Sequence, residues 1–226
     1  LVLIILNAIL GFLFVLPPGI TTTKAEETNE PAAIELALTA GSGLSTVAAS
    51  EGEVITVSLT IKRLNPDDVF AVGMFQDYVH YDLDFFEYVE DSIVCYDTGN
   101  ATAVWLENIT YGARIQCQSM SKAYTEDFLF CSFQLKVIAT EGTGTVYNNE
   151  VYAFDTSFQE IVTTVSDLRV TLVDCKHENI IKVPAKAPTC EENGWNAYSY
   201  CEQCNLFFDE NGVNQIERVP FIQGGH

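Results

Sequence analysis

Apolar and polar residues alternate over short segments between positions 34 and 174, and no stretch there keeps a helical period. In residues 54–61, Ile, Val and Leu alternate with Thr and Ser. In residues 128–138 the apolar positions 129, 131, 133, 135 and 137 predict one buried face. Successive side chains of a strand point to opposite sides, so both patterns predict strands. Further strands are expected at residues 34–38, 72–81, 85–89, 103–106, 113–117, 145–152 and 168–173. About nine short strands predict an all-β sandwich or jelly roll.

The beginning of the chain has a different pattern. Residues 1–16 are apolar except for Asn7 and Gly11, and a polar stretch then runs to Ala25. Because a membrane span needs about 20 apolar residues, we interpret residues 1–25 as an export signal that lacks its first residues. An uncleaved membrane anchor is the alternative. Residues 26–33 are acidic and contain proline, which predicts a linker, so the expected folded parts are residues 34–174 and 175–226.

The composition of the chain limits the size of its core and the kinds of partner it can bind. With 226 residues, of which 48% are hydrophobic, the chain can bury one ordinary core and a small appendage. It carries 31 acidic and 11 basic residues, a formal charge of −20. Such a charge repels nucleic acid and anionic lipid and keeps an extracellular protein soluble. A nucleic-acid-binding role is therefore not expected.

The order of several segments resembles the cohesin domain of cellulosomal scaffold proteins and related Firmicutes surface proteins. The resemblance covers about 140 residues, although the usual Pro after Tyr81-Asp82 is missing and three cysteines are present. It rests on the turn and strand at 51–59, on Tyr81-Asp82 followed by the step into 85–89, on the strand at 128–138 and on the turn at 141–144. The resemblance implies a non-catalytic jelly-roll sandwich in a cell-surface or polysaccharide-degrading assembly.

For such a domain the implied partner is a dockerin-like module on another exported protein, bound by one sheet face and its loops. The implied contact region is residues 72–81 together with 105–117. The partner-binding candidates there are Gln76, Tyr78, Asn108 and Tyr111. A dockerin would show duplicated calcium loops with D-x-[DN]-x-[DN]-G spacing, which this sequence lacks, so the chain would be the receptor.

A carbohydrate-binding module is the alternative, because similar jelly rolls bind polysaccharide through a strip of aromatic rings. Its candidate rings are Tyr78, Tyr81, Trp105 and Tyr111. Catalysis is not expected, since His80 lies within a strand pattern and no G-x-S-x-G turn occurs. Acidic residues 67, 68, 82 and 84 match no recognised calcium loop, so we interpret them as solvated surface.

The sandwich region contains Cys95, Cys117 and Cys131, an odd number. Cys131 falls on the apolar phase of its strand and is expected to be a small core residue. Cys95 and Cys117 are then the pair available for a disulfide. The sequence is equally compatible with Cys95 and Cys117 staying as two separate thiols.

After Asp174 the composition changes, because four of the seven cysteines and two of the three histidines follow it. A C-x-x-C pair, Cys201 and Cys204, can place two thiolates on one cation, and a distant His and Cys can complete a tetrahedron. A module of about 50 residues needs such a cross-link. Structural zinc is the prediction, and two disulfides are the alternative that export would favour.

This last segment also resembles repeats of large Firmicutes surface proteins. The matching residues are His177, residues 183–187, Thr189-Cys190, residues 192–194, Tyr198, Tyr200-Cys201, Cys204 and Phe207-Phe208. The resemblance implies one His and three Cys as ligands, namely His177, Cys190, Cys201 and Cys204, with Cys175 as a spare candidate. Its implied role is a structural spacer, and we expect the natural protein to continue beyond residue 226.

Overall fold

The structure is a computed structural model, and it describes residues 33–65, 72–96, 108–109, 112–118, 126–155 and 157–224. In these ranges the regular secondary structure is β-strand, which confirms the all-β prediction. No helix in this part of the chain is long and apolar enough to cross a membrane. The predicted export signal and the predicted linker, except for its last residue Ala33, lie outside these ranges.

One layer of the sandwich is a six-stranded sheet, here called sheet A. Its order is β11-β1-β3-β9-β5, and β6 also pairs with β9. All pairs are antiparallel except β1 with β11, which is parallel. The strands are β1 (Ile34–Ala40), β3 (Val54–Arg63), β5 (Phe86–Tyr88), β6 (Val94–Cys95), β9 (Phe128–Val137) and β11 (Thr163–Ser166).

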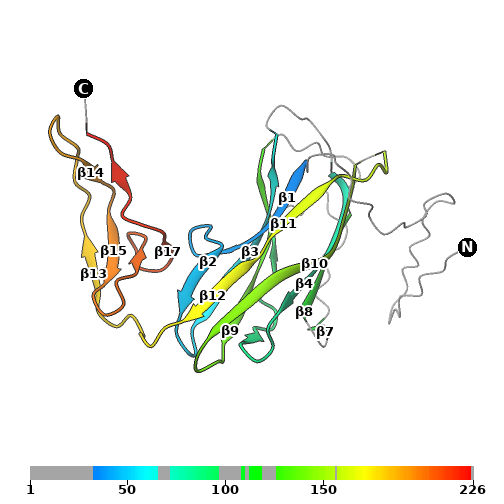
Figure 1. The fold of residues 1–226 in the computed structure, drawn as a ribbon, viewed down its shortest axis with the longest axis horizontal. Coiled ribbons are helices and arrows are strands. Elements are labelled where there is room, and N and C mark those ends of the chain that lie inside the picture. The colour runs from blue at the N-terminus through cyan, green and yellow to red at the C-terminus, as the bar shows by residue number, and fades with distance from the viewer. Residues whose placement is uncertain are drawn as a thin grey trace, which may run out of the picture. The chain divides into compact units, whose positions relative to one another are not determined.

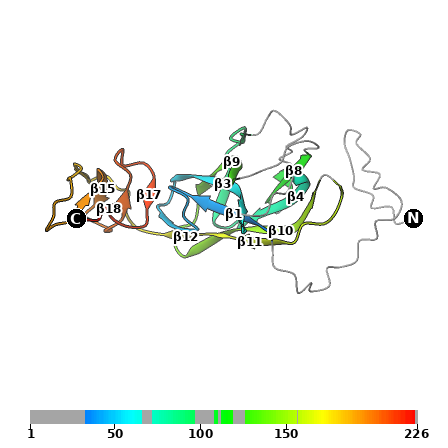
Figure 2. The ribbon, with the colours of Figure 1, turned by 90° about the horizontal axis from the view of Figure 1, so that it is seen from above.

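The other layer, sheet B, also has six strands, in the order β2-β12-β10-β4-β8-β7. Figures 1 and 2 show β4 and β8 next to each other in this layer. The long strands β10 and β4 are antiparallel, whereas β12 and β2 are parallel. The strands are β2 (Thr46–Ala49), β4 (Val72–Tyr81), β7 (Asn108–Ile109), β8 (Gly112–Gln118), β10 (Thr143–Asp155) and β12 (Leu168–Leu172).

A single apolar core lies between the two sheets. The alternating residues of β3, Ile55, Val57, Leu59 and Ile61, are buried, as their sequence pattern predicts. Sheet B contributes buried residues from β4, β10 and β12 to the same cluster. Burial of this shared surface is what holds the sheets face to face.

Several sequence predictions need correction in detail. The described part of the sandwich has twelve strands rather than about nine, because β2, β6, β7 and β11 are short and carry little alternation. Leu129 is exposed, not buried, and Phe130 is buried in its place. Cys131 is buried as expected. The strand predicted at residues 103–106 lies outside the described residues.

The residues after Asp174 form a smaller β-module, coloured yellow-orange to red in Figure 2. Its main sheet has the order β13-β15-β16-β17, and β14 pairs with β18. The strands are β13 (Ile180–Val183), β14 (Gly194–Trp195), β15 (Tyr198–Cys201), β16 (Phe207–Phe208), β17 (Gln215–Ile216) and β18 (Phe221–Ile222). The module's own core is small, with Cys175, Cys201 and Phe208 at its centre.

Candidate functional site

Four potential metal ligands converge in the small module: Cys175, His177, Cys201 and Cys204. Their ligand atoms all lie within 4.8 Å of one another. The Cys175 Sγ is 3.5 Å from the Cys201 Sγ and 3.5 Å from the His177 Nδ1, and the Cys204 Sγ is 3.4 Å from the same nitrogen. Cys175 and Cys201 are buried, so the cluster is largely shielded from water.

Two chain segments build this cluster. The β13–β15 pairing sets Ile180 opposite Cys201, which brings the segment before β13 beside the turn after β15. His177 has a positive φ of 52°, an uncommon backbone conformation, and its ring nitrogen Nδ1 faces the sulfurs. In the turn, the Asn205 N–H donates to the Cys201 carbonyl at 2.8 Å, and the Cys201 N–H donates to the Leu206 carbonyl at 3.0 Å. These bonds hold the C-x-x-C pair on one side of the turn.

The thiols of Cys201 and Cys204 differ in acidity. Burial alone raises the pKa of Cys201, but hydrogen bonds from His177, the Cys204 and Gln203 N–H groups and Cys175 lower it to about 6. Burial raises the pKa of Cys204 to about 12, and the nearby Cys201 and Cys175 add to that rise. One thiolate forms readily, whereas a second negative charge beside it is costly unless a cation is bound.

The cluster fits a tetrahedral zinc ion. With Zn–S bonds of about 2.3 Å and Zn–N bonds of about 2.0 Å, tetrahedral ligands are separated by about 3.8 Å (S to S) and about 3.5 Å (S to N). The observed separations of 3.4–3.5 Å for three of the ligand pairs are close to these values. Three sulfurs and one imidazole nitrogen are also a donor set that zinc prefers. All four positions are filled by protein, which is typical of a structural site.

The predicted ligand set requires one correction. Cys190 is exposed and is not part of the cluster, and the spare candidate Cys175 stands in its place. The strand register explains the difference: Ile180 pairs with Cys201 at the cluster, whereas Val183 pairs with Tyr198 at the other end of β13. Cys190 belongs to the loop that follows this far end. A signal for Cys175 was present in the sequence, because it stands only two residues before His177 in a Cys-x-His pattern.

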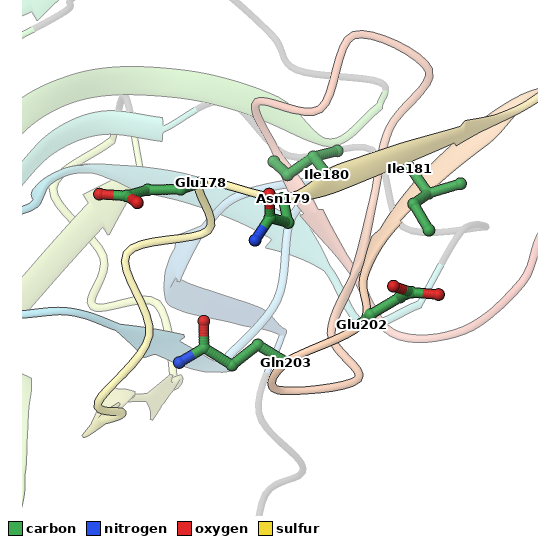
Figure 3. A pocket seen from close by; sticks show the side chains of 6 residues that line it. All are labelled: Glu178, Asn179, Ile180, Ile181, Glu202 and Gln203. Atoms are coloured by element: carbon green, nitrogen blue, oxygen red, sulfur yellow. The ribbon is translucent and has the colours of Figure 1, made fainter.

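A cavity of about 620 Å³ lies next to these segments. Figure 3 shows its six lining side chains, which come from the start of β13 and from the turn after β15. Two are carboxylates, Glu178 and Glu202, and two are amides, Asn179 and Gln203. Binding pockets for small molecules are predominantly apolar, so this polar, acidic lining does not define a second site. The chemistry of the module resides in the Cys/His cluster.

The outward face of sheet B carries two of the predicted partner-binding residues. Gln76 and Tyr78 are half-buried and alternate with the buried Asp77 and Val79, so they point away from the core. On β8 the positions opposite them are 116 and 114. The two chain stretches implicated by sequence are therefore adjacent strands of one face. Asn108 lies on the edge strand β7, and Tyr111 lies outside the described residues.

The predicted aromatic strip is only partly present on this face. Tyr81 is buried, 5% exposed, and packs edge-on against Phe86 with ring centroids 6.5 Å apart, so it belongs to the core. Trp105 lies outside the described residues. Rings that the sequence reasoning missed are on β10: Tyr147 lies 5.4 Å from the His80 ring, and Tyr152 is 46% exposed.

Of the four acidic residues considered for calcium, Asp82 and Asp84 lie in the described part of the chain. The Asp82 carboxylate accepts a hydrogen bond from the Thr145 N–H at 2.8 Å, which ties the end of β4 to β10. Asp84 is exposed in the turn that follows. Residues 67 and 68 lie outside the described residues. A local structural role accounts for Asp82.

The sequence matches no protein-family model and no curated protein. Solved structures with a similar fold are cohesins. One is the cohesin of a type I cohesin–dockerin complex from Clostridium thermocellum, with a TM-score of 0.52 and 11% identity over 66% of this chain and 98% of that one. Another is a non-cellulosomal cohesin from the archaeon Archaeoglobus fulgidus, with a TM-score of 0.50 and 13% identity over 63% and 93%. The sandwich therefore has the cohesin fold.

Proposed function

We propose that this chain is an exported, non-catalytic scaffolding protein whose sandwich binds a dockerin-bearing or similar exported protein. The binding surface is the outward face of sheet B around β4 and β8, with Gln76, Tyr78, Asn108 and Tyr111 as its contact candidates. The observation that carries the proposal is the adjacency of β4 and β8 on one face of a cohesin fold. Polar and aromatic side chains such as Gln76 and Tyr78, both half-buried, suit a protein interface.

Binding of the purified chain to a panel of calcium-loaded dockerin modules, measured by calorimetry, tests this proposal. We expect at least one module to bind and a chelator to abolish the complex, because dockerin folding depends on its calcium loops. Tyr78→Ala and Gln76→Ala should each weaken binding about 10-fold or more, as expected for residues near the centre of an interface.

The matched control is Lys136→Ala, an exposed change on β9 of sheet A, the opposite layer of the sandwich. It should leave the affinity unchanged. Weakening by Lys136→Ala equal to that by Tyr78→Ala, or no binding to any dockerin in the panel, would count against the assigned face or partner.

A carbohydrate-binding role is the second candidate, favoured by the exposed Tyr152 and the Tyr147–His80 ring pair on the same face. Stacking of aromatic rings on sugar faces would be its mechanism. Retention of the chain on insoluble cellulose or xylan, lost in Tyr152→Ala and unaccompanied by dockerin binding, would replace the docking proposal with this one.

We propose further that the C-terminal module holds one structural zinc ion through Cys175, His177, Cys201 and Cys204. The support is the 3.4–3.5 Å spacing of their ligand atoms. Metal content by mass spectrometry and cobalt substitution, read from the thiolate-to-cobalt absorption, test it. Cys175→Ser should lower the affinity for zinc more than about 10-fold, whereas Cys190→Ser should still bind one zinc ion per chain. Metal-free protein with a Cys175–Cys201 disulfide after zinc-supplemented preparation would overturn the proposal.

A further inference from the structure

Strand β6 sets one cysteine of the sandwich directly opposite another. In the antiparallel β6–β9 pair, Cys95 is the partner of Cys131. The next residue, Tyr96, donates its N–H to the Phe130 carbonyl at 3.0 Å. The Cα atoms of directly opposite residues in an antiparallel pair are about 4.5–5.5 Å apart, within the range that a disulfide spans.

The two thiol groups also share one side of the sheet. Val94 and Tyr96, which flank Cys95, are 49% and 54% exposed, and the Tyr96 hydroxyl lies 3.1 Å from the Ser132 Oγ on the outward side. Cys95 must therefore point inward, toward the fully buried Cys131. Rotation about χ1 is enough to bring two such sulfurs together, since directly opposite side chains are neighbours.

We propose that Cys95 and Cys131 form a cross-strand disulfide that fastens β6 to β9. The oxidant is a small-molecule disulfide. The Cys95 thiolate attacks it and releases one thiol, and the Cys131 thiolate then attacks the Cys95 sulfur of the mixed disulfide and releases the second thiol. Two cysteine thiols are thereby oxidised and one external disulfide is reduced. The bond closes a loop that contains β7 and β8, and it stabilises the sandwich by restricting the unfolded chain.

This pairing differs from the Cys95–Cys117 bond considered from sequence. β6 and β9 belong to sheet A, whereas β8, which holds Cys117, belongs to sheet B. The register places Cys117 opposite Phe75 and places Cys131 opposite Cys95. Burial raises the pKa of the Cys95 thiol, so the exchange is expected to be slow near neutral pH and faster in mild alkali.

The test uses the full chain with Cys190→Ser, so that this exposed thiol cannot exchange, and with zinc present to occupy the cluster cysteines. The protein is incubated with oxidised glutathione at about pH 8.5, denatured, alkylated without reduction, digested and analysed by mass spectrometry. We expect a linked peptide joining Cys95 to Cys131 and a melting temperature about 5 °C or more above that of the reduced protein.

Cys95→Ser and Cys131→Ala should each abolish the linked peptide and the melting shift, whereas Cys117→Ser should keep both. Cys95→Ser is the variant less prone to misfold, because Cys95 is only half-buried whereas Cys131 is buried. Alkylation of both Cys95 and Cys131 in the unreduced protein, or a peptide linking Cys95 to Cys117, would overturn the proposal.

Discussion

Asp77 is a carboxylic acid with no exposed surface, on the inward side of β4 between Gln76 and Tyr78. The opposite strand β10 is irregular here, with a register shift between Asn149 and Tyr152. Neither Asp77 oxygen has a well-formed hydrogen bond to the described residues. Burial raises the pKa of Asp77 to about 7, against a smaller lowering by the Asn149 N–H. The folded state therefore keeps this carboxyl protonated below neutral pH.

The free energy of unfolding should consequently fall as the pH rises. The folded pKa of about 7 lies above the unfolded value of 3.8, so Asp77 stabilises the fold fully below pH 3.8 and loses this contribution as the pH rises through 7. At about 1.4 kcal/mol per pKa unit, the loss is up to about 4 kcal/mol. Urea unfolding between pH 5 and 8 should show a smaller fall in Asp77→Asn than in wild type. The exposed control Glu87→Gln should keep the wild-type slope; equal slopes in all three proteins would contradict this prediction.

At the scale of an element, β9 shows how an irregularity changes which side chains are buried. Leu59 pairs with Cys131 but Thr60 pairs with Leu129, so one extra residue, Phe130, is inserted in β9. After this bulge the alternation changes phase. Leu129 points outward and is 38% exposed, whereas Phe130 is 1% exposed. Sequence alternation alone assigns the opposite burial to this pair.

The two neighbours should thus respond differently to truncation. Phe130→Ala removes a buried ring and leaves a cavity, so we expect a loss of about 3–5 kcal/mol in the free energy of unfolding. Leu129→Ala removes a partly exposed side chain and should cost less than about 1.5 kcal/mol. Chemical denaturation of both variants measures the difference. A larger cost for Leu129→Ala would mean that β9 keeps a regular phase.

Gly144 is a second position in these strands where the available space restricts the residue type. It is buried at the start of β10, and a Cβ added there would collide with the rings of Phe85 and Phe86. Both rings are in the core and have little room to move. Gly144→Ala should destabilise the sandwich by about 1–3 kcal/mol, as expected for overpacking. Thr143 is an exposed neighbour, so Thr143→Ala should change the melting temperature little. Equal changes in the two variants would show that the Phe85 and Phe86 rings can move aside.

Strands with full alternation could be predicted well from the sequence. Residues 72–81 were predicted as a strand and form β4, and β3 extends only two residues beyond its predicted end. Short strands such as β2 and β6 could not be predicted, because their pairing depends on distant partners rather than on local pattern. Three members of the Cys/His cluster, His177, Cys201 and Cys204, were among the predicted ligands, whereas the choice between Cys175 and Cys190 depends on the β13–β15 register.

At the scale of the whole molecule, the chain contains two cores of very different size. Among the described residues, the sandwich core includes 25 buried hydrophobic residues, whereas the core of the C-terminal module has three, Cys175, Cys201 and Phe208. Two of these three are members of the proposed metal cluster, and the His177 ring packs on Phe208 with centroids 5.1 Å apart. A core of this size cannot offset the conformational entropy of a folded module. The sandwich should therefore be stable by itself, while the module should depend on its cross-link.

Removal of the proposed zinc ion should thus unfold one part of the molecule and leave the other folded. After treatment with a strong zinc chelator, we expect amide hydrogens of residues 180–222 to lose their protection from exchange, while those of β3 and β9 keep theirs. Cys204→Ser should produce the same loss without chelator, and Cys190→Ser should behave as wild type. Hydrogen exchange followed by mass spectrometry distinguishes these segments. Loss of protection on addition of reductant, but not of chelator, would show that disulfides rather than zinc hold the module together.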